Sequence, residues 1–248
     1  MPDWQTRQNR REVCFDPVRL QELGLVDWAD RGQLTEEFRI IKRQLAQNVA
    51  EQRSGSELRQ NLVMVTSAWP QEGRTFTALN LAMSIAVEPH RRALLVDACS
   101  NRSSLETSLT AAPEYGWLDV IADPERSLAD VVLETDIPRL ELLTSGPRQR
   151  DLVEPLASDE MHRLLLRLAD SDPDRTVLID APPCLVSSDP AALASIVGET
   201  ILVVEANRTQ QQSVEAALEL LRGCPHTFLV LNKAQLVVTD TSGFYTGD

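Results

Sequence analysis

The feature that most constrains the fold is a regular alternation, from Asn61 onward, of short apolar runs with longer helical stretches. The runs are rich in Val, Ile and Leu and predict strands at 62–65, 93–96, 140–143, 176–179, 200–204 and 227–231. Helices are predicted between them, near 76–88, 127–134, 155–170, 189–197 and 210–222. Uninterrupted β-branched runs are typical of strands buried on both faces, and alternation with helices implies right-handed crossovers. The sequence therefore predicts an α/β fold with a mostly parallel, doubly wound sheet.

An N-terminal helical extension precedes this region. Residues 1–32 are polar and are expected to be irregular, whereas 33–52 carries an apolar stripe at helical spacing. Its members are Leu34, Phe38, Ile41, Leu45 and Val49. We therefore predict three parts: 1–55, a polar segment plus a helix; 56–234, the α/β domain; and 235–248, a tail.

Charge and composition narrow the function classes. The 248 residues carry 24 basic and 37 acidic side chains, a formal charge of −13 that repels nucleic-acid phosphates and anionic lipids. No apolar run reaches the ~18 residues of a membrane-spanning helix, and MPDWQTRQNRRE has no secretory apolar core. We expect a cytoplasmic protein that does not bind nucleic acid. Four cysteines and three histidines are widely scattered, so neither a disulfide framework nor a metal cluster is predicted from their spacing.

A phosphate-binding loop is predicted after the first strand of the alternating region. Residues 67–76 read SAWPQEGRTF, with Ala68, then Gly73-Arg74-Thr75 in the order of a phosphate loop whose lysine is replaced by arginine. At such a strand-to-helix turn, backbone N–H groups and the helix dipole favour an anion. Gly73 allows close backbone approach, and the hydroxyl of Thr75 can reach a magnesium ion.

Two aspartates end neighbouring predicted strands. ALLVD places Asp97 at the carboxyl end of one strand, and TVLID places Asp180 at the end of another. Ligands of doubly wound sheets bind beyond these strand ends. Carboxylates there suit a magnesium–nucleotide site, and a charged side chain ending an apolar strand needs a partner.

With these residues, the chain resembles the bacterial tyrosine kinases, the phosphate-loop autokinases of capsule and exopolysaccharide production. It is most similar to the branch associated with exosortase systems. The resemblance runs from about 34 to 233 and includes EEFRIIKRQL (36–45), NLVMVTSAWPQEGRTFTALNLAMSIA (61–86), LLVDA (94–98), LIDAPP (178–183), VVEANRTQQ (203–211) and LVLNK (229–233). It implies a P-loop NTPase-like fold, with ATP and Mg²⁺ as cofactors.

The resemblance also implies roles. Asp97, Arg74 and Asp180 would be catalytic, and Asp97 would accept the proton of an incoming tyrosine hydroxyl. Thr75, Asp97 and Asp180 would serve Mg²⁺. The nucleotide would contact Pro70, Gln71, Glu72, Gly73, Arg74, Thr75, Phe76 and, at the adenine, Asn232.

Outside the nucleotide site, the resemblance implies self-association and a phosphate acceptor. Glu36, Arg39 and Lys42 lie at helical spacing and would dock one subunit onto the next, in a ring or dimer. Such spacing also fits a solvated charged face. Tyr245 in the tail would accept phosphate, although a lone tail tyrosine can equally have no role. The implied partners are a membrane-anchored chain-length regulator, which would recruit the protein to the inner membrane, and a tyrosine phosphatase.

Three positions depart from the family pattern. Gln71 stands in place of a glycine, the residue that adopts a positive φ without steric cost. Arg74 replaces the loop lysine, and its planar fork has a different reach from an ammonium group. Cys99 replaces an aspartate, so a soft sulfur stands in place of a hard oxygen donor.

These departures leave three hypotheses. The chain is a slow protein-tyrosine autokinase that regulates exopolysaccharide polymerisation and export. Alternatively, it is a pseudokinase or scaffold of the same machinery that binds nucleotide weakly or not at all. The third hypothesis is a partition-type ATPase, which would carry an extra lysine where this chain has Trp69.

Overall fold

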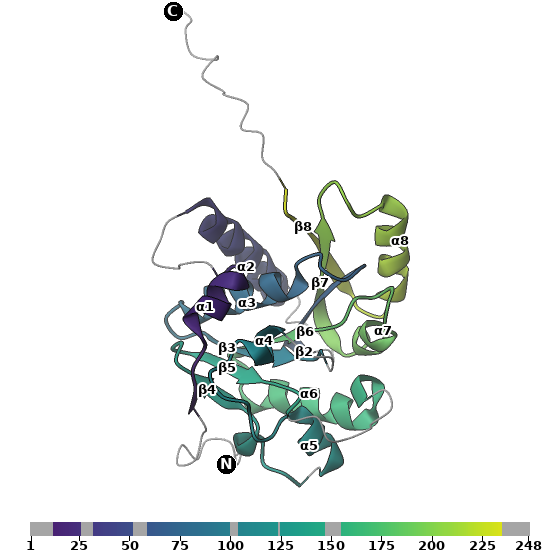
Figure 1. The fold of residues 1–248 in the computed structure, drawn as a ribbon. Coiled ribbons are helices and arrows are strands. Elements are labelled where there is room, and N and C mark those ends of the chain that lie inside the picture. Colours follow the sequence, from purple (N-terminus) through teal and green to yellow (C-terminus); the bar gives the residue numbers. More distant parts are fainter. Residues whose placement is uncertain are drawn as a thin grey trace, which may run out of the picture.

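In the described part of the chain, eight strands form one sheet (Figure 1). The computed structural model describes residues 12–25, 32–51, 59–99, 104–123, 125–146 and 155–234. Along the sheet the order is β1-β4-β5-β3-β6-β2-β7-β8, and β4 pairs antiparallel with β5 whereas the six strands β5, β3, β6, β2, β7 and β8 run parallel. The strands are β1 (Glu12–Val13), β2 (Arg59–Ser67), β3 (Arg92–Asp97), β4 (Leu133–Thr135), β5 (Leu140–Leu143), β6 (Arg175–Asp180), β7 (Val197–Glu205) and β8 (His226–Asn232).

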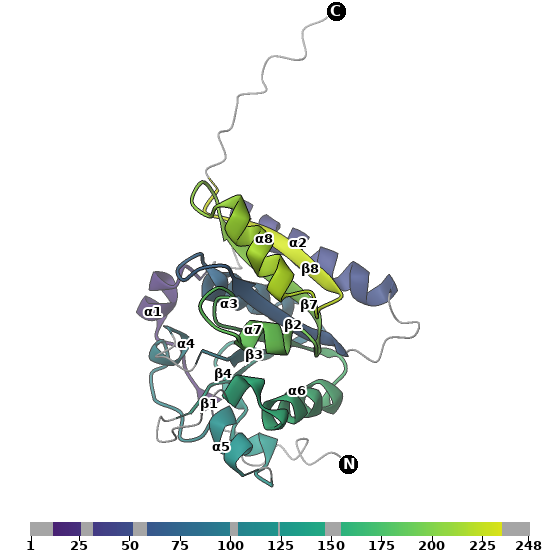
Figure 2. The same cartoon turned by 90° about the vertical axis from the view of Figure 1, so that its right-hand side faces the viewer.

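Helices cover both faces of this sheet, as the two views in Figures 1 and 2 show. The helical elements are α1 (Pro17–Glu22), α2 (Gln33–Glu51), α3 (Arg74–Ala86), α4 (Ser104–Thr107), α5 (Trp117–Ala122), η3 (Leu128–Asp130), η4 (Pro155–Ala157), α6 (Asp159–Ser171), α7 (Asp189–Leu193) and α8 (Gln211–Leu220). Alternate residues of each central strand enter different cores. In β2, for example, Leu62 and Met64 pack on the side of α5, α6 and α7, whereas Val63 and Val65 pack on the side of α2 and α3. Burial on both faces is the reason for the uninterrupted apolar runs.

The six predicted strands are confirmed, and three of the five helices predicted in the alternating region lie close to their expected ranges. The helix predicted at 127–134 is wrong, because only η3 is helical and β4 follows it. Val131 and Val132 are buried β-branched residues, and Leu133 pairs with Leu142 in the antiparallel edge hairpin. The helix predicted at 189–197 is too long, since β7 takes Val197 into the sheet opposite β2.

The N-terminal segment is more ordered than we predicted from its polarity. Val13 of β1 is buried, and β1 pairs with β4, so the chain begins its described part at the edge of the sheet. The carboxylate of Asp16 then caps α1, whose first residue is Pro17, a favoured helix start. The predicted helix at 33–52 is confirmed as α2, where Phe38 packs edge-to-face on Phe76 of α3. The three-part division of the chain stays a prediction.

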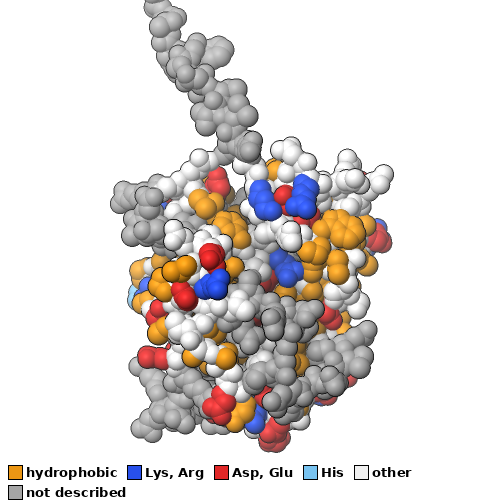
Figure 3. All heavy atoms as spheres, in the orientation of Figure 1, with side chains coloured by type: hydrophobic (Ala, Val, Ile, Leu, Met, Phe, Trp, Pro, Cys, Tyr) orange, Lys and Arg blue, Asp and Glu red, His pale blue; other side chains and the backbone are white. Residues whose placement is uncertain are grey.

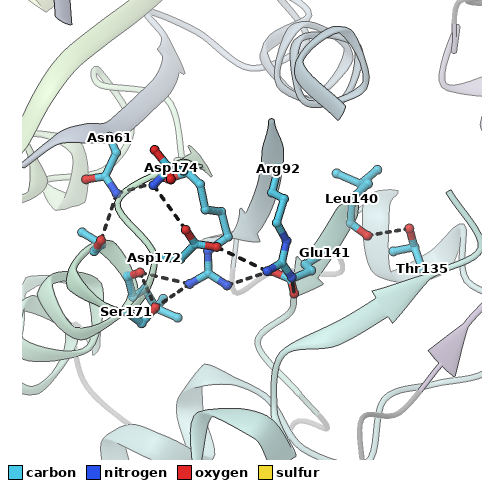
Figure 4. Close-up of polar contacts among 11 residues, drawn as sticks. Asn61, Arg92, Thr135, Leu140, Glu141, Ser171, Asp172 and Asp174 are labelled. Carbon is cyan, nitrogen blue, oxygen red and sulfur yellow. Dashed lines mark hydrogen bonds and ion pairs between the residues drawn. The ribbon is translucent and has the colours of Figure 1, made fainter. Parts of the chain in front are cut away.

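A buried charge network joins the amino ends of three central strands (Figure 4). Arg92 begins β3, Arg175 begins β6, and the two arginines lie opposite each other in the register of these strands. Glu141 of β5 pairs with both guanidinium groups, at 2.7 Å from Arg175 Nη1. Asp172 is a further partner of Arg92, at 3.3 Å. Two like charges on neighbouring strands repel, so Glu141 provides the charge that allows them to lie together.

We predict that Glu141→Gln lowers the free energy of unfolding by about 3–5 kcal/mol, because it leaves the buried Arg175 without its carboxylate partner. Urea unfolding followed by circular dichroism measures the change. The matched control is Glu160→Gln, which removes an exposed pair with Arg163 and is expected to cost about 1 kcal/mol or less. Equal effects of the two substitutions would contradict the role given to the network.

Candidate nucleotide site

The loop between β2 and α3 has the backbone form of an anion-binding turn. Gln71 and Gly73 both adopt left-handed backbone conformations, with φ of 69° and 99°. Alternation of left- and right-handed residues turns successive N–H groups toward one side and forms a nest for an anion. Gly73 is the N-cap of α3 and offers no side-chain acceptor to the first turn of that helix. The first N–H groups of α3 are therefore available to phosphate oxygens.

Gln71 is one of the three residues that depart from the family pattern, and its backbone φ is positive. A side chain occupies a left-handed position that glycine adopts without steric cost. The side chain of Gln71 is exposed, so the loop bears a local strain rather than a packing clash.

Contacts from the β7–α8 and β8 segments hold the loop in this form. Glu72 is buried, and its carboxylate accepts the backbone N–H of Trp69 at 2.9 Å and the hydroxyl of Thr209. Asn232 donates its side-chain amide to the carbonyl of Glu72 at 2.9 Å. A Cβ at position 73 would come within 1.9 Å of that same amide nitrogen, so glycine is required there by space as well as by φ.

Lys233 makes a second contact with the loop, beside Asn232. Its ammonium group donates to the carbonyl of Gln71 at 2.8 Å and lies 3.1 Å from a carboxylate oxygen of Glu205. The carboxylate of Glu205 in turn lies against Arg208. The backbone of the loop is thus attached to the carboxyl ends of both β7 and β8.

The two predicted aspartates are brought together. Asp97 ends β3 and Asp180 ends β6, and these residues lie opposite each other in the strand register. Both side chains are buried. Asp97 Oδ1 accepts the backbone N–H of Cys99 at 3.2 Å, and the Asp97 carbonyl accepts the indole N–H of the buried Trp117 at 2.9 Å.

The side chain of Arg74 reaches one of these carboxylates, that of Asp180, and the thiol of Cys99. Its Nε lies 3.3 Å from Asp180 Oδ1, and its Nη2 donates to the sulfur of Cys99 at 2.9 Å. The hydroxyl of Thr75 donates to the other oxygen of Asp180, at 2.6 Å. The guanidinium therefore lies between the strand-end carboxylate of β6 and the thiol after β3.

Burial governs ionisation in this cluster. Burial raises the pKa of Asp180 above its usual value, and the Arg74 guanidinium and the Thr75 hydroxyl oppose that rise. Burial also raises the pKa of the Cys99 thiol well above its usual value, with a further rise from the charge of Asp180, against a lowering by Arg74. Cys99 is consequently a neutral thiol at physiological pH.

The donor set of this cluster does not fit a resident Mg²⁺ ion in the arrangement that the structure shows. Ligand atoms of Asp97, Cys99 and Asp180 all lie within 4.8 Å of one another. Magnesium prefers six hard oxygen ligands, whereas one of these three is a protonated sulfur. One oxygen of Asp180 faces Arg74 and the other accepts the Thr75 hydroxyl. A guanidinium already supplies positive charge there.

Other predicted site residues lie apart from this cluster. Pro70 is exposed on the loop, whereas the ring of Phe76 packs on Phe38 and joins the core between α2 and α3. Asn232 makes a contact that braces the loop. The adenine contact that the resemblance implies for Asn232 stays a prediction.

The three residues predicted for docking do not share one environment. Glu36 and Arg39 pair with each other on the outer face of α2. Lys42 instead turns toward its own α3, where it donates to the carbonyl of Ser84 at 3.0 Å and pairs with Glu88. Tyr245, the predicted phosphate acceptor, lies outside the described residues.

Sequence reasoning missed the residues that brace the loop. Thr209, Lys233 and Glu205 lie more than 130 residues from the loop, and only the sheet order places β7 and β8 beside β2. The terminal Lys of LVLNK, directly after the last strand, was the one available signal, because a charged residue at a strand end needs a partner.

We predict that N-ethylmaleimide at about pH 8 modifies Cys99 at least tenfold more slowly than Cys14, because the raised pKa keeps the Cys99 thiol protonated and thiolate is the reactive form. Cys14 is the exposed reference thiol. Peptide mass spectrometry over time measures both rates, and unfolding in guanidinium should bring the two rates together. Equal rates in the folded protein would overturn the protonated-thiol assignment.

Comparisons with known proteins place this geometry in context. No family model matches the chain. The tyrosine-protein kinase YwqD of Bacillus subtilis is 29% identical over 185 residues, covering 74% of this chain and 76% of YwqD. The tyrosine-protein kinase ptk of Acinetobacter johnsonii is 26% identical over 163 residues, which cover 66% of this chain but only 22% of that relative.

Solved structures agree with the sequence relatives. The kinase domain of the Escherichia coli tyrosine kinase ETK superposes with a TM-score of 0.67 at 23% identity, covering 88% of this chain and 95% of that domain. A ParA family ATPase from Chlorobium tepidum superposes with a TM-score of 0.56 at 19% identity, over 70% of this chain and 74% of the other, which shows the shared fold alone. The fold is therefore that of the P-loop NTPases. By sequence and fold together, the chain is similar to the bacterial tyrosine-protein kinases.

Proposed function

We propose that this chain is an ATP-binding regulator of the protein-tyrosine autokinase type that acts in exopolysaccharide polymerisation and export. One observation carries the proposal: an uncapped helix N-terminus in a nest-forming loop faces two buried, register-matched carboxylates. The loop supplies N–H donors for a triphosphate, and the carboxylates supply a base beside it. Relatives named tyrosine-protein kinases support the reaction type.

The reaction proposed is phosphoryl transfer from ATP to a tyrosine hydroxyl. The tyrosine oxygen attacks the γ-phosphorus, the bond from that phosphorus to the β,γ-bridging oxygen breaks, and ADP leaves. Asp97 accepts the hydroxyl proton. Its Oδ1 is held by the N–H of Cys99, and its main chain is fixed by Trp117, so the carboxylate is preorganised. The guanidinium of Arg74 stabilises the charge of the transferred group.

A specific observation also favours the second candidate, a pseudokinase or scaffold. Arg74 is engaged by Asp180 and Cys99 within the chain, and Gln71 strains the loop. Loss of one charge contact in a transition state costs roughly 10²–10³ in rate by analogy with an oxyanion donor. Several such losses would leave nucleotide binding without turnover.

Partners and location extend the proposal. Among the described residues, no helix is long and apolar enough to cross a membrane. We propose a cytoplasmic protein that a membrane-anchored chain-length regulator recruits to the inner membrane, with a tyrosine phosphatase as the opposing enzyme. On the face drawn in Figure 3, described basic side chains lie among acidic and hydrophobic ones and form no continuous basic surface. Self-association would use Glu36 and Arg39 of α2, which point away from α3.

We predict that the purified chain, incubated with ATP, divalent salt and the membrane regulator, gains phosphotyrosine at Tyr245. Asp97→Asn should reduce the rate by about 10²-fold or more, because it removes the proton acceptor. Tyr245→Phe should abolish the modification. Phosphopeptide mass spectrometry measures the product, and Asp170→Asn, an exposed aspartate in α6, is the control that should leave the rate unchanged.

The outcomes separate the two candidates. Phosphorylation that disappears in Asp97→Asn would refute the pseudokinase. A complete lack of phosphotyrosine, with ATP binding intact by calorimetry, would refute the autokinase and favour the scaffold.

A further inference from the structure

We propose that this site binds ATP without a divalent metal, because Arg74 supplies from within the chain the positive charge that the strand-end carboxylates require. The inference rests on the proposed function, since it concerns how the same site takes its nucleotide. Three observations support it. They are the contacts of Arg74, the register of β3 and β6, and the network of Arg92, Arg175 and Glu141 at the other end of those strands.

The register of β3 and β6 places two carboxylates side by side. Asp97 and Asp180 are paired residues on adjacent strands, and both are about 1% exposed. Two buried carboxylates side by side repel, and the repulsion is strong where water is scarce. A cation near them is needed for both to be ionised, and a metal ion or a basic side chain can fill that need.

Arg74 supplies a positive charge beside these carboxylates and makes two contacts there. Its Nε faces Asp180 Oδ1 at 3.3 Å, while its Nη2 reaches across to Cys99 at 2.9 Å. The side chain of Arg74 is 21% exposed, so part of it remains accessible. Arginine is always protonated and its planar fork can contact a carboxylate and a phosphate at once.

Cys99 makes the same position poor for a metal. Its sulfur lies within 4.8 Å of the carboxylate oxygens, where a magnesium site would need a hard oxygen donor. The sulfur weakens the attraction for a divalent ion while leaving the guanidinium in place.

At the opposite end of the same two strands, two positive charges lie side by side and are neutralised by acidic side chains. Arg92 and Arg175 are paired in register, and Glu141 of the neighbouring strand bridges them (Figure 4). The chain therefore balances the like-charge pair at each end of β3 and β6 with its own side chains, Glu141 and Asp172 at one end and Arg74 at the other. Internal neutralisation by Arg74 is consistent with how this sheet balances charge elsewhere.

Calorimetric titration of the full chain with ATP, once in EDTA and once in excess MgCl₂, tests the proposal. We expect dissociation constants that agree within about threefold in the two buffers. Arg74→Gln should weaken binding in EDTA by about tenfold or more, since one charged contact of this kind is worth at least 1.4 kcal/mol. Arg222→Gln, on an exposed arginine of a surface ion pair, is the matched control and should change nothing.

A double variant tests the same idea in the other direction. In Arg74→Lys/Cys99→Asp, the ammonium group is compact and the new carboxylate is a hard donor. We expect MgCl₂ to tighten ATP binding tenfold or more in this variant. Electron paramagnetic resonance with Mn²⁺ alone, without nucleotide, should show bound metal in the double variant and none in the native protein.

The outcomes distinguish this inference from the proposed function. ATP binding that is tenfold tighter with MgCl₂ in the native chain, or Mn²⁺ bound by the native chain, would overturn the inference and leave ATP binding in place. An absence of ATP binding in both buffers would overturn the proposed nucleotide function and the inference with it.

Discussion

The alignment of β3 with β6 is the constraint on which the rest of the site depends. With Arg92 opposite Arg175 at one end, the same register sets Asp97 opposite Asp180 at the other. Hydrophobic burial of the residues between them holds the strands in this alignment, so the like-charge pairs cannot separate by a shift. The opposite charge at each end must therefore come from another element. Glu141 of β5 provides it beside the arginines, and Arg74 of α3 provides it beside the aspartates.

The phosphate loop depends on a second set of long-range contacts. Its backbone form is unfavourable at Gln71, and it persists because Glu72 and its neighbours are held by β7, β8 and the turn after β7. A strained loop held from outside is preorganised, because its N–H groups need not move when an anion arrives. The edge strand β8 therefore contributes to the site without presenting a residue to the phosphates.

The sequence predicted those parts of the fold that burial alone determines. Strands buried on both faces read as apolar runs, and strand ends brought Asp97 and Asp180 to one edge, as expected. Short strands such as β1 and β4 were not predicted, because they form only through pairing with each other and with β5. The orientation of the Lys42 side chain toward α3 was not predicted either. Helical spacing puts residues on neighbouring turns, and only the packing of α2 on α3 decides which of them faces inward.

The two lysines of this chain, among 24 basic residues, both fasten one element to another. Lys42 is largely buried against α3, whereas Lys233 is about half exposed beside the loop carbonyl that it contacts. Amine-directed reagents, which report on dozens of positions in an ordinary protein, thus have a single well-exposed lysine target within the described part of this one. A fluorophore or isotopic label on that amine becomes a local reporter of the phosphate loop, placed there by the composition of the chain itself.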